Sequence, residues 1–261
     1  MYKKIITCLT AIILICCGCG KKDNIPVTND LDEIIKRDVL TVGVRTDAYP
    51  FGYLDSKGSH VGYDASLGRL IAKGILGSEK KIKFVTVTAS DRMMKLYSGD
   101  VDMVIATMSV TPKRKEIIDF SSSYYTAGQA LLVKKGSKIR RLQDLSKKRA
   151  IIVFGSTSEN SIRTAVPGIG LVGYKTYPEA LKALKSGKAE AIVSDDTILL
   201  GLALKDSSLE LLPKRYSKEA YAVAFRKGEE SRDLINAVNY IIETETRNGT
   251  LKKIQETFNI K

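Results

Sequence analysis

Two segments of the chain, 96–106 (LYSGDVDMVIA) and 184–194 (LKSGKAEAIVS), follow one plan at an offset of 88 residues (184 − 96 = 88). Each contains a helix end, a Ser-Gly stop, an acidic residue three positions beyond the glycine and an apolar strand. An echo at this spacing indicates two similar α/β units rather than a short solenoid repeat. Thr107 and Asp195 take the same place in the two units, just past the carboxyl end of a strand.

The rest of the chain alternates between strand and helix patterns in the same way. We expect strands at 39–44, 83–88, 101–106, 150–154 and 191–194. We expect helices at 64–77, 91–98, 178–186, 233–246 and 250–258, the first of them capped by Asp64. This alternation predicts α/β units with mainly parallel sheets. Ligands of open α/β sheets bind at the carboxyl ends of strands, so two lobes with facing loops predict a cleft.

The first nineteen residues predict export. A basic start (MYKK) precedes an apolar run at 5–15 that is typical of a secretory signal and too short for an ordinary membrane-spanning helix. The sequence Gly18-Cys19-Gly20 resembles a bacterial lipobox, in which the cysteine is lipidated and becomes the new N-terminus. Cys19 is the favoured site and Cys17 the alternative. A plain signal peptide with incidental cysteines is the other interpretation.

Composition excludes several classes of function. All four cysteines lie within residues 1–19, which leaves the body without disulfides, a cysteine nucleophile or a cysteine-based zinc site. His60, the single histidine, lies in a turn-like Gly-Ser-His stretch and would have to serve any catalytic triad. The formal charge of +13 is spread along the chain, and neither a nucleotide-binding glycine motif nor an aromatic-basic stacking motif occurs. We therefore expect no cofactor, metal or nucleic acid, and interpret the charge as attraction to an anionic envelope or an anionic ligand.

Three arginines follow expected strands. Arg45 ends the first strand, Arg92 lies in the first turn of a helix, and Arg114 follows the loop after the strand that ends at Ala106. Arginine binds carboxylates bidentately and keeps its charge, so arginines at these places suit an acidic ligand. The alternative is that each of them is one of many surface cations.

Hydroxyl and acidic groups lie on the same kind of loop. The hydroxyls are Thr107, Ser109, Ser156 and Thr157. The last two precede a helix whose N-terminus suits an anion, although simple capping by Ser156 or Ser158 explains them equally well. Of Asp195 and Asp196, one is expected to cap the next helix and the other to hold an ammonium group. Together these groups suit a zwitterion that carries an extra acid.

From Leu40 to about Ile260 the chain resembles the bacterial extracellular solute-binding proteins of the polar amino-acid type, which deliver substrate to an ABC importer. The resemblance is carried by VGVRTDAYPFGY, VGYDASLGRLIA, GDVDMVIATMSVTPKRKEIIDFSSSYY, GSTSENSIR and EAIVSDD. It implies a periplasmic-binding-protein-like fold of type II, with two α/β lobes joined by a two-strand hinge that closes on the ligand. It also implies a monomer that is no enzyme, works with an ABC permease, and is anchored by lipid to the outer face of the cell membrane.

The resemblance divides the chain into five ranges. They are a signal peptide at 1–18, a lipidated tether and linker at 19–37, lobe 1 at 38–127 plus 225–261, and lobe 2 at 128–224. The hinges are expected near 128–131 and 220–224.

The resemblance also assigns roles to residues. Arg114 would clamp the α-carboxylate of the ligand, opposite Thr157 and its main-chain N–H. Asp195 would hold the α-ammonium, helped by Thr107 and Ser109.

The segments TASDRMMKLYSG, SDDTILLG and SKEAYAV resemble the subgroup that binds glutamate and aspartate. Arg92 would then meet the side-chain carboxylate, assisted by Arg45, and Tyr177 would contact the ligand. Ala48 departs from the family pattern, because many members carry an aromatic residue there, and this weakens the case for a basic amino acid.

Three alternatives remain beside an acidic amino-acid receptor. The first is a receptor for glutamine, cystine or another polar amino acid, in which Arg92 only braces the cleft. The second is an enzyme similar to the cyclohexadienyl dehydratases of this fold, for which Glu159 is the nearest candidate acid or base. The third is a sensory domain that reports its ligand to another protein.

Overall fold

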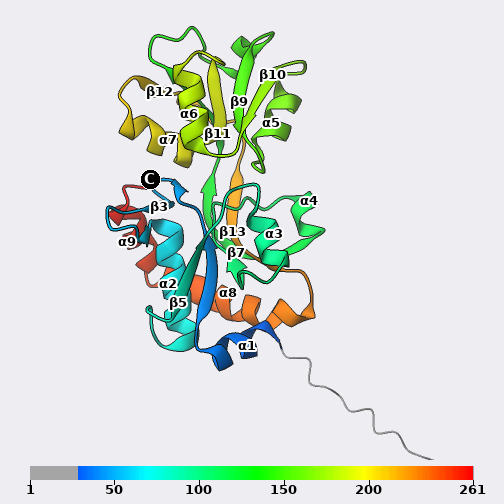
Figure 1. Ribbon diagram of the computed structural model, residues 1–261, viewed down its shortest axis with the longest axis vertical. Coiled ribbons are helices and arrows are strands. Elements are labelled where there is room, and N and C mark those ends of the chain that lie inside the picture. Colours follow the sequence, from blue (N-terminus) through cyan, green and yellow to red (C-terminus); the bar gives the residue numbers. More distant parts are fainter. Residues whose placement is uncertain (1–28, 261) are drawn as a thin grey trace, which may run out of the picture.

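The computed structural model describes residues 29–260, which form two α/β lobes stacked along the long axis of the molecule (Figure 1). Each lobe is built around its own five-stranded sheet, so the expected two-lobed α/β architecture is confirmed. The signal peptide, Cys17 and Cys19 lie outside the described residues. Between residues 29 and 260, no helix has both the length and the apolar surface to cross a membrane.

Lobe 1 draws on two separate parts of the chain. Its strands are β1 (Leu40–Val44), β2 (Asp47–Ala48), β3 (Gly52–Leu54), β4 (His60–Val61), β5 (Ile82–Thr86), β6 (Met103–Val104), β7 (Ile118–Ala127) and β13 (Glu219–Arg226). Its helices are α1 (Asp30–Arg37), α2 (Tyr63–Leu76), α3 (Arg92–Tyr97), α4 (Pro112–Lys115), the 3₁₀ turn η2 (Glu229–Ser231), α8 (Arg232–Arg247) and α9 (Thr250–Thr257). The main sheet has the order β5-β1-β6-β13-β7, and β2, β3 and β4 form a small second sheet.

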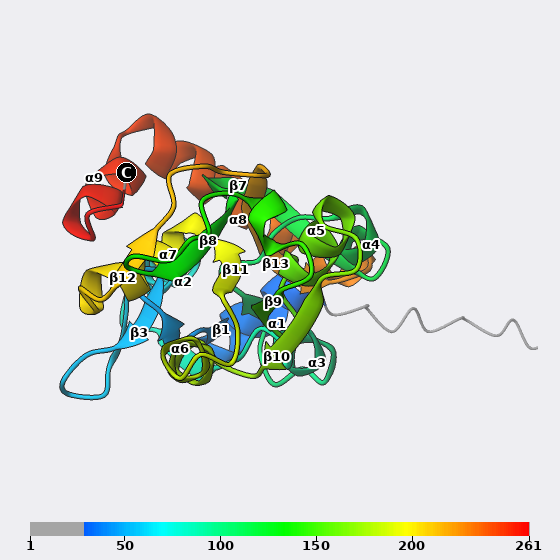
Figure 2. The ribbon, with the colours of Figure 1, turned by 90° about the horizontal axis from the view of Figure 1, so that it is seen from above.

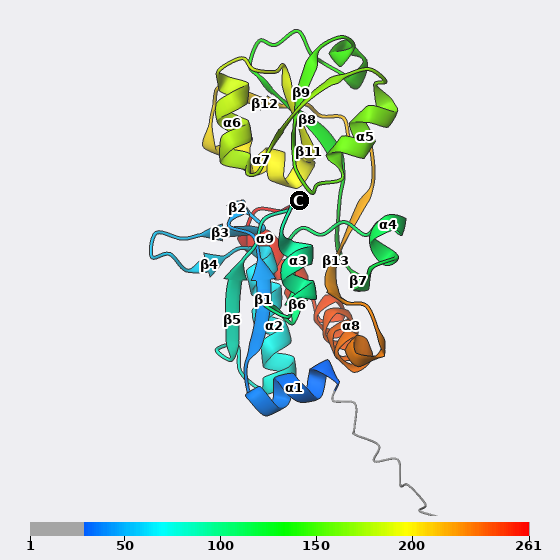
Figure 3. The same ribbon diagram turned by 45° about the vertical axis from the view of Figure 1, so that its right-hand side comes forward.

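Lobe 2 is one continuous stretch of chain. Its strands are β8 (Gln129–Lys134), β9 (Arg149–Val153), β10 (Gly170–Tyr174), β11 (Ala191–Asp195) and β12 (Leu209–Leu211). Its helices are the 3₁₀ turn η1 (Leu142–Leu145), α5 (Ser158–Ala165), α6 (Tyr177–Lys185) and α7 (Asp196–Lys205). The sheet order is β10-β9-β11-β8-β12, and α7 lies at the end of the lobe that faces lobe 1 (Figures 1 and 3).

The two echoing segments occupy equivalent places in the two sheets. In lobe 1, α3 leads into β6, which pairs in parallel with β1; in lobe 2, α6 leads into β11, which pairs in parallel with β9. Gly99 and Gly187 follow the two helices, both at a φ of 75°, a conformation that favours glycine. The equivalence predicted for Thr107 and Asp195 follows, since both lie at the carboxyl ends of these strands.

The linker expected at 19–37 is shorter than predicted, because its last eight residues form α1. The side chain of Asn29 caps this helix by accepting a hydrogen bond from the main-chain nitrogen of Asp32 at 2.8 Å. Ile34 is 1% exposed and packs in the core of lobe 1 with Leu40 and Leu234. Burying a side chain of this size contributes about 1.5–3 kcal/mol, which holds the segment on the lobe.

Two segments of the chain cross between the lobes, as the green and orange ribbons of Figure 3 show. The first crossing lies at Gly128, within the expected hinge at 128–131. The second lies at 212–218 instead of 220–224, because β13 pairs with β7 in lobe 1 from Glu219 onward. A Cβ at Gly128 would lie 2.5 Å from the main-chain oxygen of Ser217, so the glycine lets the two segments touch.

Candidate functional site

The residues predicted to carry function meet where the two sheets face each other. Lobe 1 contributes the end of β1, the start of α3 and the loop after β6. Lobe 2 contributes the loop after β9 and the end of β11. The buried members of the predicted set are Arg45, Arg92, Thr107, Ser109, Tyr177 and Asp195. Arg114, Ser156 and Thr157 are half-buried. Burying charged and polar groups is costly unless they find partners, so the partners determine what each group can do.

Arg92 is buried, and among residues 29–260 its hydrogen bonds go to main-chain oxygens alone. Nη1 donates to the oxygens of Ala106 at 2.6 Å and Thr107 at 3.4 Å, and Nη2 donates to that of Gly155 in lobe 2 at 3.2 Å. Nε has no hydrogen-bond partner. Burial, together with the neighbouring charges of Arg114 and Arg45, lowers the pKa of Arg92 to about 9. A buried cation held by neutral oxygens favours an incoming anion.

Arg114 reaches the same oxygen from another direction. Its Nη1 donates to the main-chain oxygen of Ser109 at 2.7 Å and its Nη2 to that of Gly155 at 2.8 Å. Burial lowers the pKa of this guanidinium, while the charges of Asp195 and Glu219 act in the opposite direction. Arg114 also lines the space between the lobes, where its remaining N–H groups can donate to a carboxylate.

The two lobes are in close contact at Gly155. Its φ is +80°, and a Cβ there would lie 2.2 Å from the main-chain oxygen of Ala89. Any larger residue would therefore push lobe 2 away from lobe 1. The glycine also leaves its own main-chain oxygen open to both Arg92 and Arg114.

Arg45 already has an anionic partner. Its Nε and Nη2 lie 2.8 and 2.7 Å from one carboxylate oxygen of Asp47, and its guanidinium carbon lies 4.9 Å from the centre of the Tyr177 ring. The other oxygen of Asp47 accepts from the main-chain nitrogen of Tyr177 at 3.2 Å, across the lobe boundary. Arg45, Asp47 and Tyr177 thus form one wall of the site whose net charge is close to zero.

Asp195 is the buried carboxylate of lobe 2 at the site. One of its oxygens accepts from Nε2 of Gln129, and the other accepts from the hydroxyl of Tyr221 at 2.5 Å. Burial raises the pKa of Asp195 to about 6, although the hydrogen bond from Tyr221 acts to lower it. The helix cap expected from one of this pair is not formed, since Asp195 holds the capping position of α7 without a side-chain capping bond. Asp196 is the first residue of the helix, and its carboxylate accepts from the main-chain nitrogens of Thr197 at 2.9 Å and Gly128 at 3.1 Å.

The side chain of Asp64 bonds residues beside the site and does not cap its own helix. The helix α2 begins after Gly62 without a side-chain cap, so the predicted cap at Asp64 is wrong. The buried Asp64 carboxylate accepts from the main-chain nitrogen of Thr107 and from the hydroxyl of Tyr124, both at 2.9 Å. It holds Thr107 at a φ of +46°, a strained conformation for a β-branched residue, with the threonine hydroxyl buried and unpartnered.

The hydroxyl residues before α5 do not cap that helix. Thr157 is the capping residue by position, but the helix has no side-chain capping bond. The Ser156 hydroxyl donates to the main-chain oxygen of Val153 at 2.7 Å, and the Thr157 hydroxyl accepts from Nε2 of Gln129 at 3.2 Å. The free N–H groups of this helix start therefore face the site without competition from a capping side chain.

A cavity of about 570 Å³ lies beside these groups, between the lobes. Arg114 and Glu219 of lobe 1 line it, together with Gly155, Ser156 and Thr157 of lobe 2. Within the described part of the chain, no cluster of three or more histidine, cysteine, aspartate or glutamate side chains could hold a metal ion. The arrangement suits a small zwitterion: guanidinium and N–H donors for carboxylates, and one carboxylate for an ammonium.

Sequence reasoning missed four residues at this site. They are Asp47, Asp64, Gln129 and Tyr221. Gln129 and Tyr221 flank the crossings, and both hold Asp195. Asp47, Asp64 and Tyr221 lie in segments that carry the family resemblance, but the local pattern does not indicate their contacts. Those contacts depend on which strands become neighbours in the fold.

Comparison with known proteins places this geometry in a family. The model of the bacterial extracellular solute-binding proteins, family 3, matches residues 40–260. The glutamine-binding protein of an ABC transporter from Bacillus subtilis (strain 168) is 38% identical over 237 residues, which are 86% of this chain and 85% of that protein. The glutamine-binding protein of Geobacillus stearothermophilus is 40% identical over 202 residues, which are 77% of each chain.

A solved structure resembles the whole two-lobed body. The solute receptor for L-cysteine of Neisseria gonorrhoeae superposes with a TM-score of 0.83 at 29% sequence identity. The match covers 87% of this chain and 92% of the receptor. These relatives are solute-binding proteins of transport systems rather than enzymes.

Proposed function

Since the chain belongs to the bacterial extracellular solute-binding proteins of family 3, and is thus an exported amino-acid-binding component of an ABC importer, we propose that its ligand is an acidic amino acid, glutamate or aspartate. The fold, the family and the transport role rest on the match over residues 40–260. The choice of an acidic ligand rests on the charges of the site.

Arg92 carries the argument for an acidic side chain. A zwitterionic amino acid brings one carboxylate, and Arg114 is available for it. Arg92 is a second guanidinium, it is buried and bonds neutral oxygens only, and its Nε has no hydrogen-bond partner among the described residues. Hydrogen bonds to charged groups contribute about 1.5–3 kcal/mol. A second ligand carboxylate that pairs with Arg92 should therefore add this much to the binding free energy.

The remaining residues take roles that follow from their contacts. In our proposal, Arg114 and the N–H groups near Ser156 and Thr157 hold the α-carboxylate. Asp195 holds the α-ammonium, and the free hydroxyl of Thr107 and the neighbouring Ser109 complete the same end of the site.

Arg45 acts indirectly in this proposal. Because Asp47 neutralises it, it shapes the wall beside Tyr177 without adding net charge to the site. Only a ligand that touches groups of both lobes shifts the balance between open and closed forms, and glutamate would do so through Arg92 and Asp195.

Glutamine is the second candidate, and the two glutamine-binding relatives favour it. In that case Arg92 braces Gly155, and one of its N–H groups donates to the carboxamide oxygen. Glutamine and glutamate have nearly the same shape. Their relative affinity therefore depends on the positive charge of the Arg92 guanidinium.

A ligand panel tests the proposal. Isothermal titration calorimetry on the refolded, ligand-stripped protein compares glutamate, aspartate, glutamine and cystine, and mass spectrometry identifies any amino acid released on denaturation. We expect glutamate or aspartate to bind at least about tenfold more tightly than glutamine, a difference of about 1.4 kcal/mol. Tighter binding of glutamine would assign the protein to the glutamine receptors.

We also propose that Cys19 carries the lipid anchor, including palmitate, and that the protein acts as a monomer at the outer face of the cell membrane beside its permease. Two acyl chains bury enough methylene groups for stable anchoring. Labelling cells with a clickable palmitate tests this: Cys19→Ser should lose the label while Cys17→Ser keeps it. The reverse pattern would assign the anchor to Cys17.

A further inference from the structure

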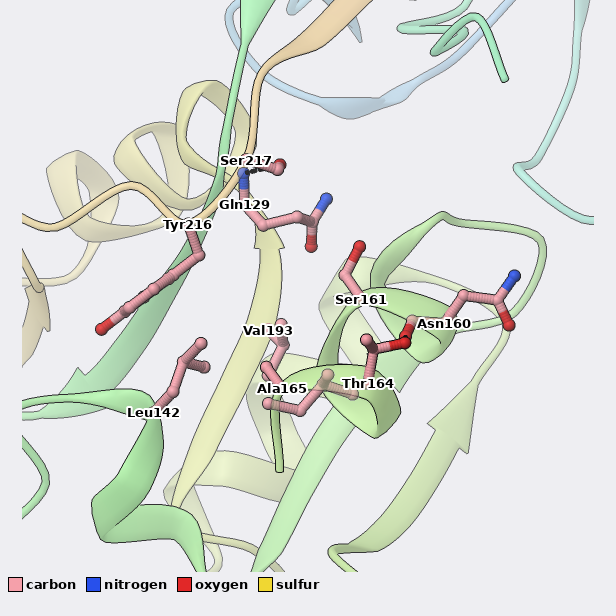
Figure 4. Close-up of a pocket in the computed structure, with 10 residues that line it drawn as sticks. Gln129, Leu142, Asn160, Ser161, Thr164, Ala165, Val193, Tyr216 and Ser217 are labelled. Carbon is pink, nitrogen blue, oxygen red and sulfur yellow. Dashed lines mark hydrogen bonds between the residues drawn. The ribbon is translucent and has the colours of Figure 1, made fainter. Parts of the chain in front are cut away.

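A second pocket lies in lobe 2, apart from the guanidinium groups (Figure 4). Its cavity of about 460 Å³ lies between α5, Leu142 of η1 and the second crossing segment. Leu142, Val193 and the ring of Tyr216 form an apolar wall, and Ser161 and Thr164 of α5 form a polar rim. The volume lies within the range of pockets that bind small organic molecules, and it has room for an aromatic ring with a polar substituent.

The lining carries no charged side chain. This is unusual for a chain in which 27% of the residues are charged. A charged occupant would lose its hydration without gaining a counter-ion, which is costly. The pocket therefore selects a neutral molecule.

Two of the lining residues, Tyr216 and Gln129, each have a buried polar side-chain atom without a hydrogen-bond partner among the described residues, and Gln129 is the one that also bonds Asp195. Its Nε2 donates to the carboxylate of Asp195 and, at 3.2 Å, to the hydroxyl of Thr157. A carboxylate accepts hydrogen bonds, so this contact fixes which end of the amide is nitrogen. The oxygen is then directed to the other side, and Figure 4 shows it turned toward the space beside Ser161 and Val193.

This oxygen lacks a donor. Gln129 is 1% exposed, and its Oε1 has no hydrogen-bond partner among the described residues. An unsatisfied buried acceptor costs about 1–3 kcal/mol. A bound molecule with an N–H or O–H group relieves that cost.

We propose that this pocket is a second ligand site, which binds a small neutral molecule with an apolar body and one N–H or O–H donor directed at Oε1 of Gln129. Gln129 links the pocket to Asp195, and Ser217 links it to the second crossing segment. A hydrogen bond to Oε1 polarises the amide and strengthens its donation to Asp195. Occupancy of the pocket therefore favours the ionised form of Asp195; this last step rests on the proposed function.

The test uses benzamide as the probe and benzoate as its charged counterpart of the same shape. Each is titrated into ¹⁵N-labelled, ligand-free protein and followed by NMR. We expect benzamide to shift the side-chain amide signals of Gln129 and the main-chain signals of Thr164 and Ser217, and benzoate to leave them in place. Equal shifts with both probes, or shifts scattered over the surface, would overturn the proposal.

Two variants of α5 give the control. Ala165 is exposed and lines the pocket, so Ala165→Leu fills it without touching the guanidinium groups. Arg163, on the same helix, pairs with Glu159 and does not line the pocket. Benzamide shifts should vanish in Ala165→Leu and persist in Arg163→Ala, and shifts that persist in both would refute the site.

The link to the amino-acid site is measured separately. In calorimetry at pH 5.4, where a carboxyl with a pKa of about 6 is about one-fifth ionised, saturating benzamide should tighten glutamate binding by up to about fivefold. Because the NMR titration uses ligand-free protein, it reports on the pocket even if glutamate does not bind. Benzamide binding without any effect on a bound amino acid would overturn the link through Gln129.

Discussion

The guanidinium of Arg92 in lobe 1 donates a hydrogen bond to the main-chain oxygen of Gly155 in lobe 2, 3.2 Å away. Arg114 donates to the same oxygen at 2.8 Å. The two residues proposed to hold the carboxylates of the ligand are therefore also contacts between the lobes. In our proposal, ligand binding and lobe closure therefore depend on the same pair of side chains.

Replacing Arg92 with glutamine should change specificity. Arg92→Gln removes the buried charge but keeps hydrogen-bonding groups, so glutamate affinity should fall by roughly 10- to 150-fold, corresponding to 1.5–3 kcal/mol. Glutamine affinity should change much less, and calorimetry with both ligands gives the ratio. Arg69→Gln is the matched control, since Arg69 bonds the main-chain oxygen of His60 and packs over Phe84, away from the site. An unchanged ratio in Arg92→Gln would remove the case for an acidic ligand.

A methyl group at Gly201 should oppose closure. The Cβ of Gly201→Ala, in α7, would lie 2.0 Å from the main-chain oxygen of Tyr49 in lobe 1. Alanine favours helix over glycine by about 1 kcal/mol, so lobe 2 itself should be no less stable. We expect amino-acid affinity to fall at least about tenfold, which corresponds to about 1.4 kcal/mol, and small-angle scattering to show no compaction at ligand levels that compact the wild type. Normal affinity with normal compaction would show that the lobes close without this contact.

Ligand affinity should decline in acid through Asp195. Burial raises the pKa of Asp195 to about 6 in the ligand-free protein, and an ammonium group binds the ionised form. Below that pH the carboxylate must first lose a proton, so affinity should drop by about tenfold for each further pH unit. Calorimetry from pH 7.5 to 4.5 measures the slope.

Asp195→Asn supplies the control for this profile. The variant should bind at least about 30-fold more weakly at pH 7.5, as expected for removal of one partner of a buried charge pair. Its affinity should be flat between pH 6 and 4.5. A wild-type profile that is equally flat would argue that another group holds the ammonium.

Protein stability should respond to pH through Asp64. Burial raises the pKa of Asp64 to about 7, against about 4 for an exposed carboxyl in the unfolded chain. Between these values the folded state binds a proton that the unfolded state releases. The contribution of Asp64 to the free energy of unfolding is therefore largest below about pH 4, declines as the pH rises to about 7, and is constant above that.

Urea denaturation of ligand-free protein across pH 4.5–8 measures the contribution of Asp64 to the free energy of unfolding. Both the wild type and Asp64→Asn contain Asp195, so its pH-dependent contribution cancels when their free energies of unfolding are subtracted. The difference in free energy of unfolding therefore reports on Asp64 alone. The difference should decrease with rising pH and level off near pH 7. A difference that does not change with pH would mean that Asp64 stays ionised in the fold.

The sequence was sufficient to predict the two-lobed fold and those site residues that lie at the ends of predicted strands. The echo of 96–106 at 184–194 predicted two α/β units, and strand ends located Arg92 and Asp195. It was insufficient for Gln129 and Tyr221, because they reach Asp195 only when β8 and β13 pass beside β11 and the site. We expected the second crossing at 220–224, but β13 already pairs with β7 in the sheet of lobe 1 from Glu219 onward.

The pairing of β13 with β7 has a consequence for biosynthesis. The core of lobe 1 contains Leu234, Val238 and Leu251 beside Leu40 and Val42, so this lobe stays incomplete until the end of the chain has been made. Lobe 2 is continuous and has all its strands much earlier. During synthesis, lobe 2 can therefore fold before lobe 1, although lobe 1 begins first in the sequence.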